Sequence, residues 1–149
     1  SKEKFKVFHP GGTIGQNLLL VKDVMLTGNK LPLVSHNSNI LKAIQIITKK
    51  SLGIGIITKN KNAIGIVTDG DIRRGAKKFA GDNKINVLMT KKPFYISEDL
   101  SAAKALSIMS EKKITSLLVS SDKDYKKNKK YFRPKGILHV HSLLKYGIK

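Results

Sequence analysis

The feature that most constrains the fold is an internal repeat, because one half of the chain resembles the other. A shift of 62 residues places residues of the first half on similar residues of the second. The aligned pairs are Val34 with Ile96, Ser35 with Ser97, Ala43 with Ala105, Ile44 with Leu106, Ile47 with Met109 and Ile57 with Val119. Self-similarity at a fixed period indicates one supersecondary unit used twice. A unit this short does not easily bury its own apolar face, so we expect the two copies to pack against each other.

The spacing of the repeat changes at two points. The segments GIV at residues 65–67 and GIL at residues 136–138 align with a shift of 71, so the second copy is nine residues longer. The extra residues fall in the basic stretch at residues 123–133. Met25 and Met89 open the two copies at a shift of 64, so the first copy is two residues longer at its start. We expect residues 1–20 to form a linker, residues 21–80 the first repeat and residues 81–149 the second.

Each copy has the pattern strand, helix, strand, strand, helix. Apolar residues spaced three and four apart predict a helix that lies on a sheet, and they are Ile40, Leu41, Ile44 and Ile47. The expected elements of the first copy are residues 31–34, 39–50, 52–58, 63–68 and 69–79, with a hairpin between the last two strands. Those of the second copy are residues 94–96, 100–112, 114–119, 136–140 and 141–146. The prediction is an α+β fold in which each β-α-β-β-α copy has a three-stranded sheet and two helices. We expect a pseudo-two-fold relation between the copies and a ligand cleft where they meet.

Composition excludes several classes of protein. The chain has 149 residues and no Cys, which excludes disulfide frameworks, thiolate metal sites and cysteine nucleophiles. Its apolar runs are far shorter than the ~20 residues of a membrane-spanning helix. The first residues do not resemble a signal peptide. We therefore expect a cytoplasmic protein without a membrane partner, and a first residue other than Met suggests part of a longer chain.

The net charge of +19 leaves two interpretations open. A basic chain is typical of nucleic-acid binding. The only arginines, however, are Arg73, Arg74 and Arg133. Lysines spread along the whole chain favour a solvated basic surface, so a nucleic-acid partner is not the first expectation. Residues 123–133, KDYKKNKKYFR, form either a mobile loop or a base-stacking segment that uses Tyr125, Tyr131 and Phe132.

The segment GIVTDGDI at residues 65–72 carries the strongest chemical signal. A strand ends before Thr68, and Asp71 stands in the first turn of the next helix. The Thr68 hydroxyl and the free N–H groups of that turn can bind a phosphate, and Asp71 can accept hydrogen bonds from a ribose. Alternatively, Thr68 and Asp69 only cap the helix. Arg74 either pairs with the phosphate or faces solvent.

Two copies that end in this strand-to-helix turn resemble the cystathionine-β-synthase (CBS) domain. A tandem pair resembles the regulatory module that senses adenosine nucleotides and related ligands, and the resemblance spans about residues 21–148. The second copy departs from the pattern, because His139 replaces Thr68 and Ser142 replaces Asp71. His139 and His141 share a strand face, but a zinc site needs three or four ligands, so we expect no metal.

A closer resemblance is to the C-terminal part of arabinose-5-phosphate isomerases. It rests on FHPGGTIGQNLL at residues 8–19, DVML at 23–26, VTDGDIRR at 67–74 and GILHVHSLL at 136–144. The family joins an N-terminal sugar-isomerase domain to a CBS pair. The resemblance implies that this domain is missing here and that His9 matches an active-site histidine of the family. This segment alone would then not be catalytic, whereas the parent chain would be an aldose-ketose sugar-phosphate isomerase.

The resemblance also implies a function and partners. The parent would interconvert ribulose 5-phosphate and arabinose 5-phosphate on the pathway to the lipopolysaccharide sugar 3-deoxy-manno-octulosonate (Kdo). The pair would sense CMP-Kdo or an adenosine nucleotide, would require no cofactor and would form a homodimer within a tetrameric parent. Thr68, Asp69, Asp71, Arg74, His139, His141 and Ser142 are the expected ligand-binding residues. The alternatives are a basic nucleic-acid-binding module and a ligand-free dimerisation scaffold.

Overall fold

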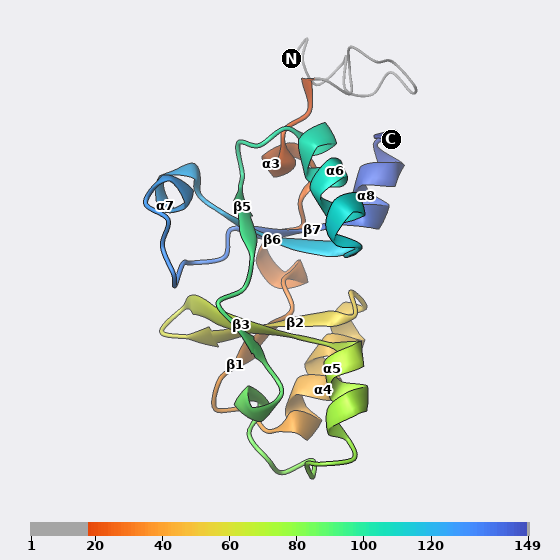
Figure 1. The fold of residues 1–149 in the computed structure, drawn as a ribbon, viewed down its shortest axis with the longest axis vertical. Helices are drawn as coiled ribbons and strands as arrows, with labels where there is room; N and C mark the ends of the chain where they lie inside the picture. The colour runs from red at the N-terminus through yellow and green to blue at the C-terminus, as the bar shows by residue number, and fades with distance from the viewer. Residues whose placement is uncertain (1–17, 149) are drawn as a thin grey trace. The chain divides into compact units, whose positions relative to one another are not determined.

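The chain folds into two compact units that exchange segments. The structure is a computed structural model and describes residues 18–148. Unit 1 contains the described residues up to Thr27, residues 94–128 and the C-terminal segment from residue 134. Unit 2 contains residues 28–93 and 129–133 (Figure 1). Each unit therefore includes a short segment that is separated in sequence from its main part.

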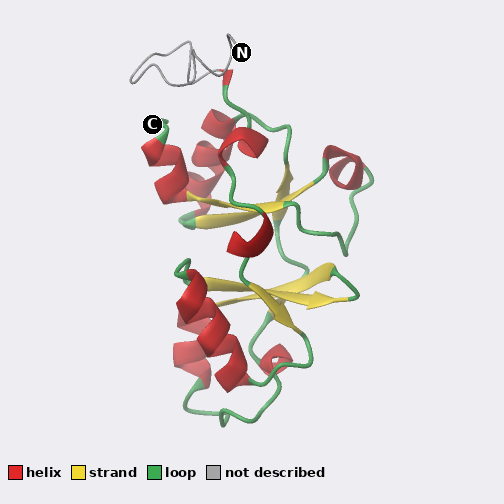
Figure 2. Cartoon of the chain, turned by 180° about the vertical axis from the view of Figure 1, so that it is seen from behind, coloured by secondary structure: helices red, strands yellow, loops and turns green. Residues whose placement is uncertain are grey.

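Unit 2 is a four-stranded sheet with helices on one face (Figure 2). Its elements are η1 (Gly28–Lys30), β1 (Leu33–Ser35), α4 (Ile40–Lys50), β2 (Ile54–Lys59), β3 (Asn62–Thr68), α5 (Asp69–Gly75), η2 (Ile85–Val87) and β4 (Thr90–Lys91). The strand order is β1-β2-β3-β4. β1 pairs parallel with β2, and the other two pairings are antiparallel. The sequence predicted three strands, and β4 is the addition.

Local sequence explains the elements of unit 2. Asn39 caps α4, because its side chain accepts a hydrogen bond of 2.8 Å from the Lys42 N–H. The buried residues of α4 are Ile40, Ala43 and Ile47. The predicted stripe is confirmed only in part, because Leu41 is 56% exposed and Ile44 is partly buried. The predicted hairpin is confirmed, since Asn60 and Lys61 form its two-residue turn with positive φ angles of 51° and 66°.

Unit 1 repeats the order strand, helix, strand, strand, helix with a three-stranded sheet, and a further helix is added between its last two strands. It contains α3 (Val21–Val24), β5 (Tyr95–Ser97), α6 (Ala102–Lys112), β6 (Ser116–Ser120), α7 (Asp122–Lys126), β7 (Gly136–His139) and α8 (Val140–Lys145). β5 pairs parallel with β6, and β6 pairs antiparallel with β7. Helices α6 and α8 cover one face of this sheet (Figure 2). The core on that face includes Ala105, Met109 and Leu143.

The two methionines that open the repeats occupy matching positions in the two units. Met89 packs on Gly65 of β3, where an added Cβ would lie 2.7 Å from the Met89 sulfur. Met25 packs in the same way on Gly136 of β7. The opening segment of the first repeat thus packs within unit 1, and that of the second repeat packs within unit 2. Glycine is required at both strand positions because the neighbouring backbone is also close.

The basic stretch at residues 123–133 is not a loop throughout, because it begins within the helix α7. Asp122 opens the helix α7, and Ser121 caps it by accepting a hydrogen bond of 3.1 Å from the Asp124 N–H. Further along, Phe132 is only 1% exposed. Its carbonyl accepts a hydrogen bond of 2.8 Å from the Ala63 N–H in unit 2. The proposal that Phe132 stacks on bases is therefore wrong, because its ring lies in the core.

The second helix of unit 2 is shorter than the sequence predicted. α5 ends at Gly75 rather than continuing to residue 79. A side chain at Gly75 would meet Leu88, since the connector after α5 folds back against the helix. Ile85 in this connector is fully buried. Within residues 18–148, no helix is long and apolar enough to cross a membrane.

Candidate functional site

The strand-to-helix turn of unit 2 forms a reciprocal cap. The Thr68 hydroxyl accepts a hydrogen bond of 3.1 Å from the Asp71 N–H. In return, the Asp71 Oδ2 accepts one of 2.9 Å from the Thr68 N–H. This arrangement satisfies two backbone donors that a helix start leaves free. Capping, the alternative interpretation of these residues, is therefore present in the structure.

The second oxygen of Asp71 faces an arginine. The Arg74 Nη2 lies 2.7 Å from the Asp71 Oδ1. The Arg74 side chain is 74% exposed and the Asp71 side chain 19%. An exposed ion pair contributes at most about 1 kcal/mol. A ligand hydroxyl can therefore replace Arg74 at this oxygen at small cost.

The structure brings three of the four predicted residues of unit 2 together. Thr68, Asp71 and Arg74 are linked by hydrogen bonds. Asp69 is directed elsewhere, because its carboxylate lies near Gly53 at the start of β2. The Asp69 N–H also donates a hydrogen bond of 3.0 Å to the Gly53 carbonyl. Asp69 therefore helps to fix the two strand ends.

The equivalent turn of unit 1 is capped by a histidine. The His139 Nδ1 accepts a hydrogen bond of 3.1 Å from the His141 N–H at the start of α8. The two imidazole rings meet edge to face with centroids 4.6 Å apart. Burial lowers the pKa of His139, and the neighbouring His141 lowers this pKa further. A neutral His139 is the form that accepts the capping hydrogen bond. Ser142 is half-buried in the first turn and supplies no carboxylate.

One polar residue near this turn was missed by the sequence analysis. Ser116 of β6 lies opposite His139 of β7 in the strand register. Its hydroxyl is buried and has no hydrogen-bond partner among residues 18–148. The repeat contained a signal for it, because the 62-residue shift aligns Ser116 with the apolar Ile54. A polar residue at a core strand position indicates a special contact.

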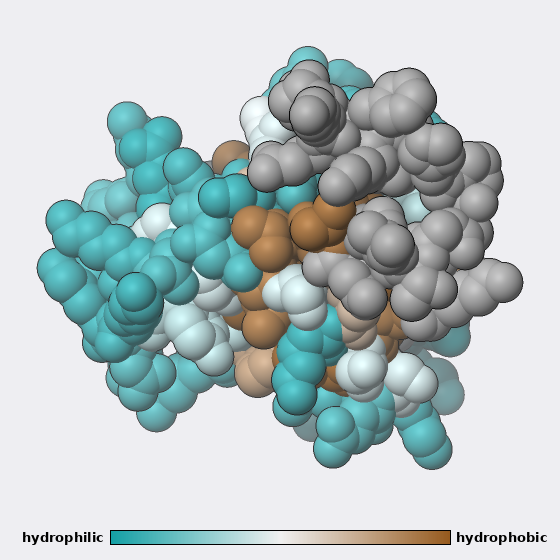
Figure 3. All heavy atoms as spheres, turned by 90° about the horizontal axis from the view of Figure 1, so that it is seen from above, coloured by the Kyte–Doolittle hydropathy of each residue, from teal (hydrophilic) through white to brown (hydrophobic). Residues whose placement is uncertain are grey.

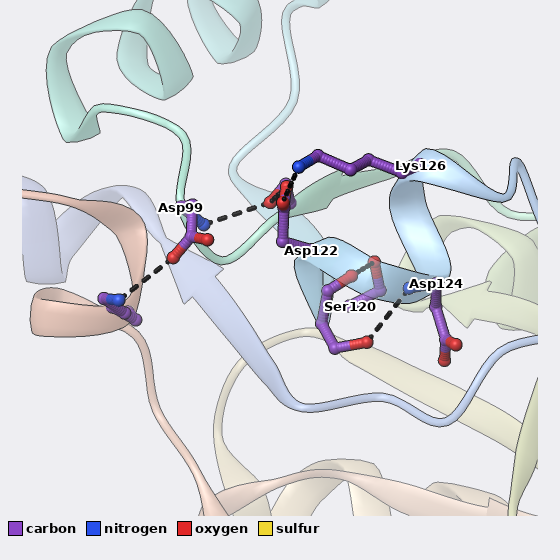
Figure 4. A network of polar contacts seen from close by, with 8 residues as sticks. Asp99, Ser120, Asp122, Asp124 and Lys126 are labelled. Atoms are coloured by element: carbon purple, nitrogen blue, oxygen red, sulfur yellow. Dashed lines mark hydrogen bonds and ion pairs between the residues drawn. The ribbon is translucent and has the colours of Figure 1, made fainter.

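A network of polar contacts fixes α7 in unit 1 (Figure 4). The Ser97 hydroxyl donates a hydrogen bond of 2.7 Å to the Asp122 Oδ1, and the Lys126 ammonium lies 3.0 Å from the Asp122 Oδ2. The Ser97 hydrogen bond, followed by Lys126, lowers the pKa of Asp122. The Asp99 N–H donates to the Ser97 hydroxyl, and Lys22 pairs with Asp99 at 3.0 Å. These acids therefore have structural partners, which the sequence analysis did not foresee.

Some predicted features lie outside the site. His9 and the rest of the HPGG segment, residues 9–12, lie outside the described residues, so the predicted match of His9 to a catalytic histidine stays a prediction. Within the described part of the chain, no group of three or more His, Cys, Asp or Glu residues is placed to hold a metal ion. His139 and His141 instead serve the cap of α8.

Comparison with curated proteins relates the chain to sugar-phosphate isomerases. It is 38% identical to an uncharacterised protein of Rickettsia prowazekii over 99% of its length, which is 44% of the relative. It is 35% identical to the arabinose 5-phosphate isomerase KdsD of Yersinia pestis, over 99% of this chain and 44% of that protein. The chain thus spans less than half the length of these relatives.

Solved structures share the fold. CBSX2 in complex with AMP, a CBS-pair protein from Arabidopsis thaliana, superposes with a TM-score of 0.69 at 18% identity, covering 85% of this chain and 94% of that one. A CBS domain pair in complex with 5-methylthioadenosine and S-adenosyl-L-methionine gives 0.67 at 24% identity, covering 85% and 93%. The model of the CBS domain matches residues 21–78 and again residues 84–149. The chain therefore belongs to the CBS domain family and carries this domain as a tandem pair.

Proposed function

We propose that this chain is the regulatory CBS pair of an arabinose 5-phosphate isomerase and that it senses a nucleotide-type ligand. The observation that carries the proposal is the extent of the similarity to KdsD proteins, which covers 99% of this chain in the Yersinia pestis relative. That similarity includes the HPGG linker as well as the two CBS domains. The parent protein would interconvert ribulose 5-phosphate and arabinose 5-phosphate for Kdo synthesis in a tetramer.

Asp71 is the proposed anchor for the ligand. Its Oδ1 faces the exposed Arg74 rather than the protein interior, so a ribose hydroxyl can take the place of the guanidinium. Arg74, once released, can pair with a phosphate. The Thr68 hydroxyl accepts the cap hydrogen bond through a lone pair, which leaves its proton for donation to a phosphate oxygen. Asp69 supports this turn through Gly53, which immediately precedes β2.

The unit 1 turn offers a different kind of contact. His139, His141 and Ser142 are proposed to contact the polar part of a ligand without holding a ribose by a carboxylate. Adenosine compounds are the first choice of ligand, because solved CBS pairs of the same fold carry AMP or S-adenosyl-L-methionine. CMP-Kdo is the second choice, as the end product of the proposed pathway. Regulation requires the ligand to bind two conformations with unequal affinity.

Isothermal titration calorimetry with AMP, S-adenosyl-L-methionine and CMP-Kdo tests the proposal. The variant Asp71→Asn keeps one side-chain oxygen for the cap but loses the charge and the second acceptor. We expect about a tenfold or larger loss of affinity, since a charged hydrogen bond contributes about 1.5–3 kcal/mol. The matched control is Asp82→Asn, an exposed acid of the same unit. Equal affinity of both variants for the ligand would reject Asp71 as the anchor.

A dimerisation scaffold is the second candidate, and exposed apolar side chains favour it. Leu144 of α8 is 56% exposed, and Leu18 before α3 is 44% exposed. Figure 3 shows apolar side chains gathered among hydrophilic ones on the face that this view presents. Sedimentation velocity of Leu144→Lys would show a loss of dimer if α8 forms the interface. A scaffold would keep its dimer and bind none of the three nucleotides.

A further inference from the structure

Unit 2 contains a pocket of about 580 Å³ that is separate from the proposed nucleotide turn. It lies beside the β2–β3 hairpin, next to the segment that includes β4 and next to the inserted residues 129–133. None of its lining residues is Thr68, Asp69, Asp71 or Arg74. Its volume is within the range of about 300–1,000 Å³ that small-molecule sites occupy.

Four lysines define the chemistry of this lysine pocket. Lys59, Lys91, Lys92 and Lys130 line it, and no acidic residue does. None of the four forms an ion pair within the described part of the chain. By contrast, a pocket of about 340 Å³ in unit 1 is lined by Asp99 and Asp122 as well as one lysine. Lysines are spread along the whole chain, but in this pocket four of them line one space that no acidic residue lines.

The backbone around the lysine pocket is fixed by contacts on three sides. Lys91 is held in β4 by pairing with Gly65 of β3. Lys59 precedes the tight hairpin turn. Lys130 and the half-exposed Tyr131 precede Phe132, which is buried in the core and hydrogen-bonded to Ala63. The positions of the lysine backbones are therefore set before any ligand arrives, which lowers the ordering cost of binding.

We propose that the lysine pocket binds a small ligand that carries two or more phosphate groups. Lysine ammonium groups are point charges that bind phosphate oxygens. Four of them compensate the charge of a di- or triphosphate, which a monophosphate would not require. The Lys130 ammonium lies 5.4 Å from the ring centroid of Tyr131, so this aromatic ring supports the cation at the rim. The two asparagines of the hairpin add amide donors for remaining oxygens.

The structure favours a small polyphosphate over single-stranded nucleic acid. Strand binding uses aromatic rings on which successive bases stack. The ring of Phe132 is buried. Tyr125 packs edge to face against Tyr95 in unit 1, with centroids 5.9 Å apart. Tyr131 is thus the one ring of the basic stretch that lines the lysine pocket.

Titration of inorganic tripolyphosphate into the full chain tests the proposal. The pocket variant Lys91→Gln/Lys130→Gln removes charges from two walls of the pocket. The control Lys49→Gln/Lys77→Gln removes the same charge from exposed positions of unit 2 outside it. We expect about a tenfold weaker binding for the pocket variant and less than about a twofold change for the control. Circular dichroism melting checks that both variants fold.

Three outcomes would overturn the proposal. Equal losses in the two double variants would mean that tripolyphosphate binds the general positive charge of the surface. No measurable binding by the unsubstituted chain would remove the site altogether. An oligothymidylate that binds more tightly than tripolyphosphate, and loses the same affinity in the pocket variant, would assign the pocket to nucleic acid. Binding of AMP to the pocket variant, measured in parallel, keeps this result separate from the proposed role of Asp71.

Discussion

The two units cap the helix that follows their last long strand with different side chains. In unit 2, Thr68 and Asp71 cap α5 reciprocally. In unit 1, His139 alone caps α8 through its Nδ1. A cap is therefore what the fold requires, whereas a carboxylate is not. The Asp71 Oδ2 serves the cap, whereas its Oδ1 lies outside the cap and faces the exposed Arg74, and this second oxygen makes unit 2 the better candidate for holding a ribose.

Another part of the repeat, the packing of the opening methionine on a strand glycine, is the same in both units. Met89 packs against Gly65 in unit 2, and Met25 packs against Gly136 in unit 1. A Cβ added at either glycine would also lie 2.9 Å from a backbone carbonyl oxygen. The two copies are thus most similar where their opening segments pack on the sheets. They differ most at the two strand-to-helix turns and at the inserted segment. This pattern separates residues that serve the fold from residues available for ligands.

The largest expected effect tests the insertion that only the second repeat carries. Phe132→Ala should destabilise the protein by about 3–5 kcal/mol, because a fully buried aromatic side chain is lost and a cavity remains. Urea denaturation followed by circular dichroism measures the change. The neighbouring Tyr131→Ala is the control and should cost far less, because Tyr131 is 49% exposed. Similar small effects of both variants would mean that the inserted segment does not contribute to the core of unit 2.

A second test addresses the packing that the units share. Gly65→Ala and Gly136→Ala should each destabilise by about 1–3 kcal/mol, since the added methyl overpacks against the methionine and the adjacent backbone. The two losses should be similar if the exchanged segments contribute equally. Thermal melting of both variants gives the comparison, with Gly81→Ala as a control because its Cβ would meet only the Leu41 side chain at 3.6 Å. A strong asymmetry would show that one unit depends less on its exchanged segment.

The repeat was enough to predict the order of elements and the family. The sequence placed the helix over residues 39–50, and α4 covers Ile40–Lys50. It did not place β4, because a two-residue strand has no periodicity to detect. The sequence analysis also missed α7. The lysine-rich residues 126–130 were interpreted as part of a loop, and the short capped helix that ends at Lys126 was not recognised. The pairing of Phe132 with Ala63 joins residues far apart in sequence, which no local pattern reveals.

The sequence predicted which residues belong to the site better than it predicted how they contact one another. The spacing of Thr68 and Asp71 indicated both capping and binding, and the geometry contains the cap. The pairing of Asp71 with Arg74 follows from their separation of three residues on a helix. The lysine pocket was not foreseen, because it requires the hairpin, β4 and the inserted segment to meet in three dimensions. Charge counts alone could not distinguish it from the general basic surface.

A third prediction compares the two caps directly. Thr68→Ala removes the hydroxyl that accepts from the Asp71 N–H and should cost about 1 kcal/mol. His139→Ala removes the corresponding acceptor in unit 1 and should cost a similar amount for the same reason. Urea denaturation measures both. If Thr68→Ala has no effect, the reciprocal cap contributes nothing, and the contrast between the two turns would then have no energetic basis.

The smallest expected effect is a pH dependence that only the histidine cap confers. Burial, with a contribution from His141, lowers the pKa of His139 in the folded state below its ordinary value of about 6.5. The unfolded chain therefore takes up a proton more readily, so the contribution of His139 to stability is complete above about pH 6.5 and is lost as the pH falls through the lower folded pKa. His139→Asn keeps an acceptor for the His141 N–H but does not titrate. Melting temperatures between pH 5 and 8 should fall more steeply toward acid for the unsubstituted chain than for this variant. Parallel curves for the unsubstituted chain and His139→Asn would show that the histidine cap is not sensitive to pH, and the two turns would then differ only in the carboxylate.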